Sequence, residues 1–329
     1  MDSSKNKNPE RIALVCGSWS SNIGNALYNI GAQWLLKECG RSASIFPESP
    51  RWKESVDAEK HYDPIAELDV DLVVLNGPCL WKRLDYVYRD TFEKLYERGI
   101  KVAYLSAGMA SYDDAEAEWI ARFMQEFPPE FIFTRDHKCF ELLQPNAECP
   151  IFDGLCTSMF LPEAHTPISL VKNDYVVLNF DETEPELEFD EIGSARVIKK
   201  NAKRLPESIL GFDVIRTDNR SIDTGYKSIY RRPSTYHSDL PWGYCSILSA
   251  AKTVYSERVH TCATALAYGR AAQFIRLSPR SHESRSLVFE RIGVPEIFNG
   301  PVRIDKDFLA KEKAKMIGEL RKIRNSDFG

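Results

Sequence analysis

KTVYSERVHTCATALAYGRAAQFIR, residues 252–276, is the stretch that decides the fold of this chain. Within it, segments 253–255 and 273–275 are short apolar runs, and each is typical of a buried strand. Residues 261–268 between them are rich in Ala, and Gly269 is suited to end a helix. The pattern predicts strand, turn, helix and strand, which is the repeating unit of an open α/β sheet.

The turn of this unit is SERVH, residues 256–260. An open α/β sheet places its ligand site at such a turn, between the carboxyl end of a strand and the next helix. Helix-end N–H groups favour anions, and Arg258 and His260 add a cation and a titratable group. Spacing alone leaves two interpretations open. Arg258, His260 and Ser256 form a ligand site, or Arg258 pairs with Glu257 or a surface carboxylate while His260 caps the helix.

The composition is typical of a soluble globular protein. The chain has 329 residues, 43% hydrophobic and 28% charged, enough for two domains with separate cores. Its net charge of −5 gives no basic field, so we expect no nucleic-acid partner. No apolar run approaches the roughly 20 residues of a membrane span. The polar first ten residues lack the apolar centre of a signal peptide, so we expect a cytoplasmic protein.

The eight Cys residues are scattered, with no CxxC and no His-Cys cluster. This spacing indicates neither a disulfide framework nor a zinc site, so we expect no metal. Cys16, Cys79 and Cys262 lie in or beside apolar runs, which is typical of buried thiols.

Two successive sets of strands divide the chain. The first set is predicted at residues 11–16, 42–46, 69–75, 101–105 and 131–134, and the second at 175–180, 212–216, 253–255 and 273–275. Residues 162–173 contain two Pro and no periodicity, which indicates a linker. We therefore predict an α/β fold of two Rossmann-like domains facing a cleft, with a glycosyltransferase-B-like architecture. The predicted domains are 1–162 and 174–329, with 163–173 as the linker.

Three charged segments of the second half carry further predictions. The acidic run 181–191, DETEPELEFDE, is interpreted as a solvated loop rather than a site. Residues 195–204 are predicted to be a basic helix or turn. Near the carboxyl end, an amphipathic helix must bury its apolar face, and in two-domain folds of this kind such a helix often crosses back to the first domain. That face comprises Phe308, Leu309, Met316, Ile317, Leu320 and Ile323.

Polar or Gly-containing turns follow most of the predicted strands. The carboxyl ends of parallel strands meet at one edge of a sheet, so we expect these turns to face the same crevice. The long Pro-broken segment with Arg231, Arg232, His237, Asp239 and Trp242 is either an acceptor loop or an exposed connection. The candidates at the turns are Asn22, Gly24, Asn25, Asn76, Gly77, Ser106, Gly108, Arg135, Asp153, Asn179, Ser256, Arg276 and Arg280.

Several of these turns resemble motifs of the polysaccharide pyruvyl transferase family. S-x-R-x-H at residues 256–260, followed by a small-residue helix, a Gly and a strand, looks like the carboxy-terminal signature of that family. Ser106 and Gly108 are similar to the S-x-G that follows its fourth strand. Asn22, Ile23, Gly24 and Asn25 resemble its N-x-G-D.

The chain departs from the family pattern at three positions. Asn25 stands where the family has a carboxylate, and Pro78 stands in a turn that is Gly-rich in many relatives. Cys139 replaces the usual Ser of the R-[DE]-x-x-S motif that begins at Arg135. Pro78 also removes one N–H donor from the turn.

The resemblance implies transfer of the enolpyruvyl unit of phosphoenolpyruvate onto sugar hydroxyls, with formation of a pyruvate ketal. Phosphoenolpyruvate would be a co-substrate, without a further cofactor, and the acceptor would be a sugar or a lipid-linked glycan of polysaccharide or exopolysaccharide synthesis. The inner face of the membrane would present such a lipid-linked acceptor. The carboxy-terminal half would hold the donor and the amino-terminal half the acceptor.

The resemblance also implies roles for individual residues. Arg135 and Arg258 would bind the donor, with Arg276 or Arg280 as a weaker third cation, because a guanidinium suits both carboxylate and phosphate. His260 would be the acid and base. Two other functions stay open: a nucleotide-sugar glycosyltransferase of the same architecture, and a sugar-binding relative without catalysis.

Overall fold

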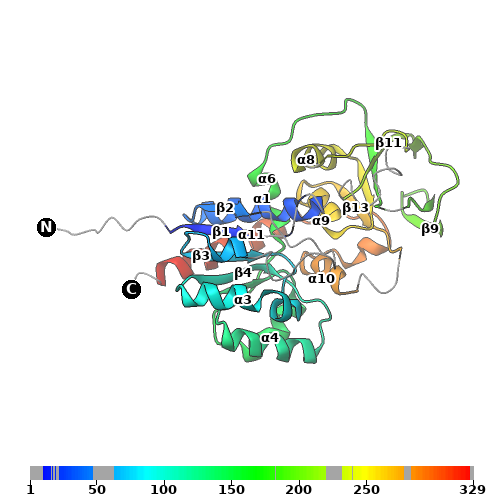
Figure 1. The fold of residues 1–329 in the computed structure, drawn as a ribbon. Helices are drawn as coiled ribbons and strands as arrows, with labels where there is room; N and C mark the ends of the chain where they lie inside the picture. The colour runs from blue at the N-terminus through cyan, green and yellow to red at the C-terminus, as the bar shows by residue number, and fades with distance from the viewer. Residues whose placement is uncertain are drawn as a thin grey trace.

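The computed structural model describes residues 10–15, 17, 19, 22–46, 63–181, 183–219, 232–238, 240–277 and 283–326. The chain forms two α/β halves, each built on its own sheet, which confirms the predicted fold class (Figure 1). The amino-terminal half is blue to green in Figure 1, and the carboxy-terminal half runs from green to orange.

The amino-terminal half contains a parallel sheet with strand order β2-β1-β3-β4-β5-β6. Its strands are β1 (Ile12–Val15), β2 (Ala43–Phe46), β3 (Leu72–Asn76), β4 (Lys101–Ala107), β5 (Ile132–Thr134) and β6 (Ile151–Asp153). Its helices are α1 (Ile23–Glu38), α2 (Asp63–Ala66), α3 (Arg83–Glu97), α4 (Asp114–Glu126) and α5 (His137–Leu143). Two 3-10 turns follow, η2 (Gln144–Asn146) and η3 (Thr157–Phe160).

Apolar side chains cover both faces of this sheet, because successive residues of a strand point to opposite sides. Ile12 and Leu14 of β1 pack into the core beside α1. Ala13 and Val15 pack into a second core beside α3 and α4. A sheet buried on both faces explains why these strands are nearly continuous apolar runs.

Helix α1 approaches the chain closely at η3, and Gly31 makes this contact possible. A Cβ atom at Gly31 would overlap the carbonyl oxygen of Thr157, which is backbone and has little freedom to move. Gly318 near the carboxyl end is also helical, but a Cβ there would meet no atom within 4 Å.

We expect Gly31→Ala and Gly318→Ala to shift stability in opposite directions. Overpacking typically costs about 1–3 kcal/mol, and a clash with backbone belongs at the upper end of that range or beyond. In an open helix interior, Ala in place of Gly contributes up to about 1 kcal/mol. Urea unfolding of both variants measures the difference, and equal free energies of unfolding would contradict the close approach of α1 to η3.

The carboxy-terminal half contains a five-stranded sheet with strand order β10-β11-β7-β12-β13. Its strands are β7 (Tyr175–Asn179), β10 (Ser208–Ile209), β11 (Phe212–Thr217), β12 (Thr253–Ser256) and β13 (Ala271–Phe274), all parallel except the short edge strand β10. Its helical elements are α8 (Pro241–Ala250), α9 (Val259–Ala267), α10 (Glu283–Arg291) and η5 (Pro295–Phe298).

A separate hairpin corrects the prediction for residues 195–204. This segment forms strand β9 (Ala195–Lys199), which pairs antiparallel with β8 (Glu186–Phe189) instead of forming a helix or turn. Leu187 and Phe189 pack toward the core, while Glu186 and Lys199 pair across the strands at 2.9 Å. Alternation of apolar and charged side chains is the pattern of a half-buried strand.

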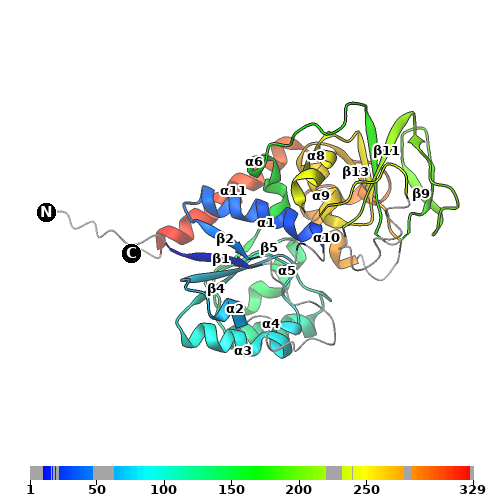
Figure 2. The same cartoon turned by 45° about the horizontal axis from the view of Figure 1, so that its top comes forward.

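The two halves are joined by the connection after α6 (Leu161–Ala164) and by the terminal helix α11 (Lys306–Ser326). Residues 165–174 contain no helix or strand, whereas residues 163 and 164 of the predicted linker belong to the end of α6. Helix α11, red in Figures 1 and 2, lies beside α1 of the amino-terminal half. Its Arg321 Nη2 donates to the carbonyl oxygen of Glu38 at 3.0 Å, and Lys313 Nζ pairs with Glu163 at 2.8 Å. In the described part of the chain, no helix combines the length and apolarity that crossing a bilayer requires.

Candidate functional site

Arg258 and His260 lie at the start of α9, directly after strand β12. The helix begins at Val259, two residues earlier than predicted, so His260 belongs to its first turn. Arg258 is the N-cap residue, and its side chain makes no capping hydrogen bond to the helix. The interpretation of His260 as the cap is therefore wrong. The Arg258 backbone N–H donates to Ser256 Oγ at 2.9 Å, which fixes the turn.

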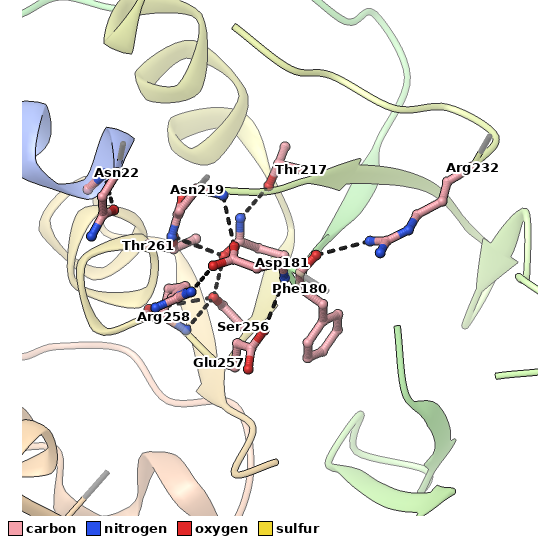
Figure 3. Close-up of polar contacts among 12 residues, drawn as sticks. Asn22, Phe180, Asp181, Thr217, Asn219, Arg232, Ser256, Glu257, Arg258 and Thr261 are labelled. Atoms are coloured by element: carbon pink, nitrogen blue, oxygen red, sulfur yellow. Dashed lines mark hydrogen bonds and ion pairs between the residues drawn. The ribbon is translucent and has the colours of Figure 1, made fainter. Parts of the chain in front are cut away.

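Asn179 holds three strand ends together beneath this turn. Its Oδ1 accepts from Ser256 Oγ at 2.7 Å and from Thr261 Oγ1 at 3.1 Å. Its Nδ2 donates to Thr217 Oγ1 at 2.8 Å. All four side chains are buried, so these hydrogen bonds set the position of α9 on the sheet. Ser256, Thr217 and Thr261 are labelled in Figure 3.

Asp181 is the ion-pair partner of Arg258 (Figure 3). Its side chain is only 1% exposed, whereas that of Arg258 is 24% exposed. Asp181 Oδ1 also accepts the backbone N–H of Asn219 at 2.9 Å. Glu257 turns the other way, and its Oε1 accepts the backbone N–H of Asp181 at 3.0 Å. Arg258 thus pairs with a buried carboxylate. The alternative pairing with Glu257 or a surface carboxylate, which the spacing left open, is wrong.

The buried position of Asp181 also corrects the interpretation of the acidic run as a solvated loop. Glu184, three residues further on, is buried as well and forms a bidentate pair with the fully buried Arg216, at 2.7 and 3.0 Å. Among the described residues of the run, the exposed carboxylates are Glu188 in β8 and Asp190 and Glu191 just after it.

The amino terminus of α1 meets this site from the other half of the molecule. The backbone N–H of Ile23 donates to the carbonyl oxygen of Asn219 at 2.9 Å, and Asn22 caps α1 by accepting from Gly24 N at 3.0 Å. A Cβ atom on Gly24 would lie 3.3 Å from Nδ1 of His260, so only a Gly allows this approach without displacing the imidazole. We call this meeting of residues 22–25, 179–181, 217–219 and 256–261 the junction.

Tyr28 connects the junction to the interior of the amino-terminal half. Its ring centroid lies 4.8 Å from that of His260, and its hydroxyl donates to Asn25 Oδ1 at 3.1 Å. Gly77 has φ of +97° and lies against the Tyr28 ring, where a side chain would collide. Asn25 thus places a neutral amide one ring away from the imidazole.

Asn76 and Ser106 hold η3 in place inside the amino-terminal half. Asn76 Nδ2 donates to Asn29 Oδ1 at 2.7 Å, and Asn76 Oδ1 accepts from Thr157 Oγ1 at 3.3 Å. Ser106, with φ of +56°, accepts the backbone N–H of Thr157 at 3.1 Å. Both side chains are buried, and their hydrogen bonds join β3 and β4 to α1 and η3. These contacts position η3.

Arg135 lies at the end of β5 beside the buried carboxylate of Asp136, 3.6 Å away. Burial raises the pKa of Asp136, while Arg135 and the hydrogen bond from the Tyr112 hydroxyl, at 2.6 Å, lower it. A Cβ on Gly108 would collide with the guanidinium, so Gly108 makes room for it. Arg135 Nε is the atom that lies 3.6 Å from Asp136 Oδ2, so its contact is an ion pair rather than a hydrogen bond among the described residues.

We expect Arg135→Met to destabilise the fold by about 3–5 kcal/mol near neutral pH, because it leaves Asp136 buried and unpaired. The folded pKa of Asp136 then lies above its unfolded value, so the folded state binds the extra proton. The lost stability should return as the pH falls through that folded pKa. Urea unfolding across acidic pH measures this. The double variant Arg135→Met/Asp136→Asn should lack the pH dependence, and an identical slope in both variants would contradict the pairing.

Other predicted residues lie apart from the junction. Arg276 is exposed and lies over the Phe298 ring, with 3.8 Å between its guanidinium carbon and the ring centroid. Asp153 accepts from Arg291 Nε at 3.0 Å, which joins β6 to α10. Arg280, Arg231 and Asp239 fall outside the described residues.

The Pro-broken segment contributes two side chains near the strand ends. Arg232 Nη1 donates to the carbonyl oxygen of Phe180 at 3.0 Å (Figure 3). His237 Nδ1 lies 2.7 Å from Asp218 Oδ1, just after β11. Trp242 is 42% exposed, and its ring centroid lies 4.9 Å from that of His165.

Sequence reasoning missed Asp181, Thr217, Asn219 and Thr261. Asp181 lies two residues after Asn179, and Thr261 follows His260, so for these two residues the identified neighbours were the available signal. Thr217 and Asn219 lie just after the predicted strand 212–216, where no candidate was named. Across the residues that the structure places, no three His, Cys, Asp or Glu side chains gather as metal ligands.

Comparison with known proteins agrees with this architecture. S. aureus MnaA, solved with UDP, superposes with a TM-score of 0.55 at 8% identity, over 95% of this chain and 90% of that one. The UDP-N-acetylglucosamine 2-epimerase of Rickettsia bellii gives a TM-score of 0.50 at 12% identity, over 97% of each chain. At this identity the likeness shows the fold alone, and it confirms the predicted glycosyltransferase-B-like architecture.

The family is shown by the sequence. No curated protein sequence matches the chain. The family model described as polysaccharide pyruvyl transferase matches residues 22–276, which extend from the cap of α1 to two residues past β13 and include the junction. The chain belongs to the polysaccharide pyruvyl transferase family.

Proposed function

We propose that this protein transfers the enolpyruvyl unit of phosphoenolpyruvate to two hydroxyls of a sugar, forming a pyruvate ketal and releasing phosphate. The observation that carries the proposal is the start of α9. There Arg258 is held by Asp181, and His260 lies two residues further on, beside the amino terminus of α1.

The donor is an anion with a carboxylate and a phosphate, and the start of α9 is suited to it. The first N–H groups of a helix lack partners within the helix and carry a partial positive charge. Arg258 adds a full charge there, and its side chain stays partly exposed while Asp181 fixes its direction. A guanidinium held in this way loses little conformational freedom when it binds an anion. Arg135 is the second cation that we assign to the donor, because a guanidinium suits both carboxylate and phosphate.

Ketal formation requires proton transfer at three points. C3 of the donor takes up a proton and becomes a methyl group, which leaves a cation at C2. The first sugar hydroxyl attacks C2 and loses its proton, phosphate leaves, and the second hydroxyl attacks and loses its proton. We assign the proton transfer at C3 to His260, because an imidazole both gives and takes protons near neutral pH.

The acceptor is a glycan, as the family implies. We assign it to the amino-terminal side of the junction, where Asn22 and Asn25 offer neutral amide groups. Tyr28 contacts both Asn25, through its hydroxyl, and His260, through its ring. A lipid-linked acceptor would bring the reaction to the inner face of the membrane, in the cytoplasm. Polysaccharide or exopolysaccharide synthesis is the pathway class that consumes such a product.

Calorimetric titration with phosphoenolpyruvate tests this function without knowledge of the acceptor. We expect saturable binding with a micromolar to millimolar Kd, and none for UDP-N-acetylglucosamine. Binding of the UDP-sugar without binding of phosphoenolpyruvate would instead support a nucleotide-sugar transferase. Donor binding without transfer to any glycan would support a sugar-binding relative without catalysis.

A further inference from the structure

A cavity of about 330 Å³ lies in the amino-terminal half, between the sheet and helix α3. Asn22, Asn25 and Asn76 line it at the carboxyl edge of the sheet, and Tyr28 lines it beside them. It continues along β3 as far as Val73, three residues back from Asn76, or roughly 10 Å at the rise of a strand. Its volume falls within the range of small-molecule sites, about 300–1,000 Å³.

The cavity contains no charge among the described residues that line it. Its outer part presents amides and a phenol, and its inner part consists mainly of aliphatic and aromatic side chains from β3, β4 and α3. A carboxylate or phosphate would lose its hydration there without gaining a counter-charge, which is strongly unfavourable. The donor anion therefore does not belong in this cavity.

Tyr28 lies between the cavity and His260. Its side chain lines the cavity, and its ring also packs against the His260 imidazole. A ligand whose polar part contacts Asn22 and Asn25 at the edge would thus present that part to the junction while its apolar part extends beneath α3.

We propose that this cavity binds an apolar substituent, such as an alkyl or aryl aglycone, attached to the neutral sugar that accepts the enolpyruvyl unit. The inference rests on the proposed function and specifies its acceptor. Amide groups at the edge bind sugar hydroxyls, and removal of the substituent from water provides the affinity. A free sugar would fill only the polar edge and would bind weakly.

Matched glycosides test this inference in the wild-type protein. Hexyl and methyl β-glycosides of glucose, galactose and mannose differ only in the length of the alkyl group. In calorimetric titrations we expect at least one hexyl glycoside to bind at least tenfold more tightly than its methyl partner. Equal affinities within all three pairs would overturn the inference.

Thr91 provides the control variants, because it is buried in α3 and lines the cavity. Thr91→Phe fills the cavity and should abolish the preference for the hexyl glycoside, whereas Thr91→Val keeps its volume and should retain the preference. A preference that survives in Thr91→Phe would place hexyl binding elsewhere and overturn the inference. If Thr91→Phe lowers the unfolding midpoint, Thr91→Leu tests the same point with a smaller side chain.

Titration with phosphoenolpyruvate separates this inference from the proposed function. Donor binding should be the same in all Thr91 variants, because the described residues that line the cavity carry no charge and do not include Arg258. Hexyl preference without any donor binding would leave the cavity assignment standing and refute the pyruvyl donor.

Discussion

Replacement of His260 by Ala is expected to lower turnover by about two to four orders of magnitude, which is the usual contribution of a positioned acid or base. The donor should still bind with an affinity close to that of the wild type, because Arg258 and the start of α9 remain. Phosphate release from phosphoenolpyruvate in the presence of a glycan acceptor measures turnover, and calorimetry measures binding.

The matched control for this variant is His137→Ala. His137 is exposed on α5 and contacts Asp153 and Glu141, away from the junction. Its removal should leave turnover unchanged. His260 also packs on Tyr28, so unfolding midpoints must show that His260→Ala retains the fold. Turnover in His260→Ala within a few-fold of the wild type would remove His260 from the chemistry.

Replacement of Arg258 by Ala is expected to weaken donor binding by about 2–5 kcal/mol, or roughly 30-fold to several thousand-fold. The donor would lose a charged partner that is held in place before binding. The same variant should also destabilise the fold, because the Asp181 carboxylate, 1% exposed, loses its counter-ion. Breaking a buried pair in this way typically costs about 3–5 kcal/mol.

A second pair of variants separates the two effects of Arg258. The double variant Arg258→Ala/Asp181→Asn removes both charges, so it should recover most of the stability while donor binding stays lost. Arg258→Lys keeps a charge for Asp181 but not the planar fork, so it should bind the donor with intermediate affinity. If the stable double variant binds phosphoenolpyruvate as tightly as the wild type, Arg258 is not a donor ligand.

The sequence was sufficient to predict the elements whose pattern is local. The unit around residues 252–276 combines β-prone runs, an Ala-rich helix and a Gly stop, and β12, α9 and β13 follow it to within two residues. Because the carboxyl ends of parallel strands meet at one edge of a sheet, Asn179 and Ser256 were expected to face the same crevice. In the structure, Ser256 Oγ donates to Asn179 Oδ1 at 2.7 Å.

Other features depend on contacts that the sequence does not show. Asp181 is first in a run of acidic residues, and composition treats such a run as one solvated block. It is buried because β7 ends two residues earlier and Arg258 returns to it from 77 positions away. The hairpin β8–β9 was missed for a different reason. The alternation in Glu186–Phe189 predicts a strand, but the charge of the run outweighed that pattern.

Transfer to an acceptor tests the central claim most directly. The protein is incubated with phosphoenolpyruvate labelled with carbon-13 at C3 and a panel of glycans, with His260→Ala as the control. The account predicts that one glycan gains the mass of the enolpyruvyl unit, that C3 becomes a methyl carbon, and that phosphate appears in equal amount only with the wild type. Transfer of a sugar from a UDP-sugar to the same glycans, with C3 of phosphoenolpyruvate unchanged, would contradict it.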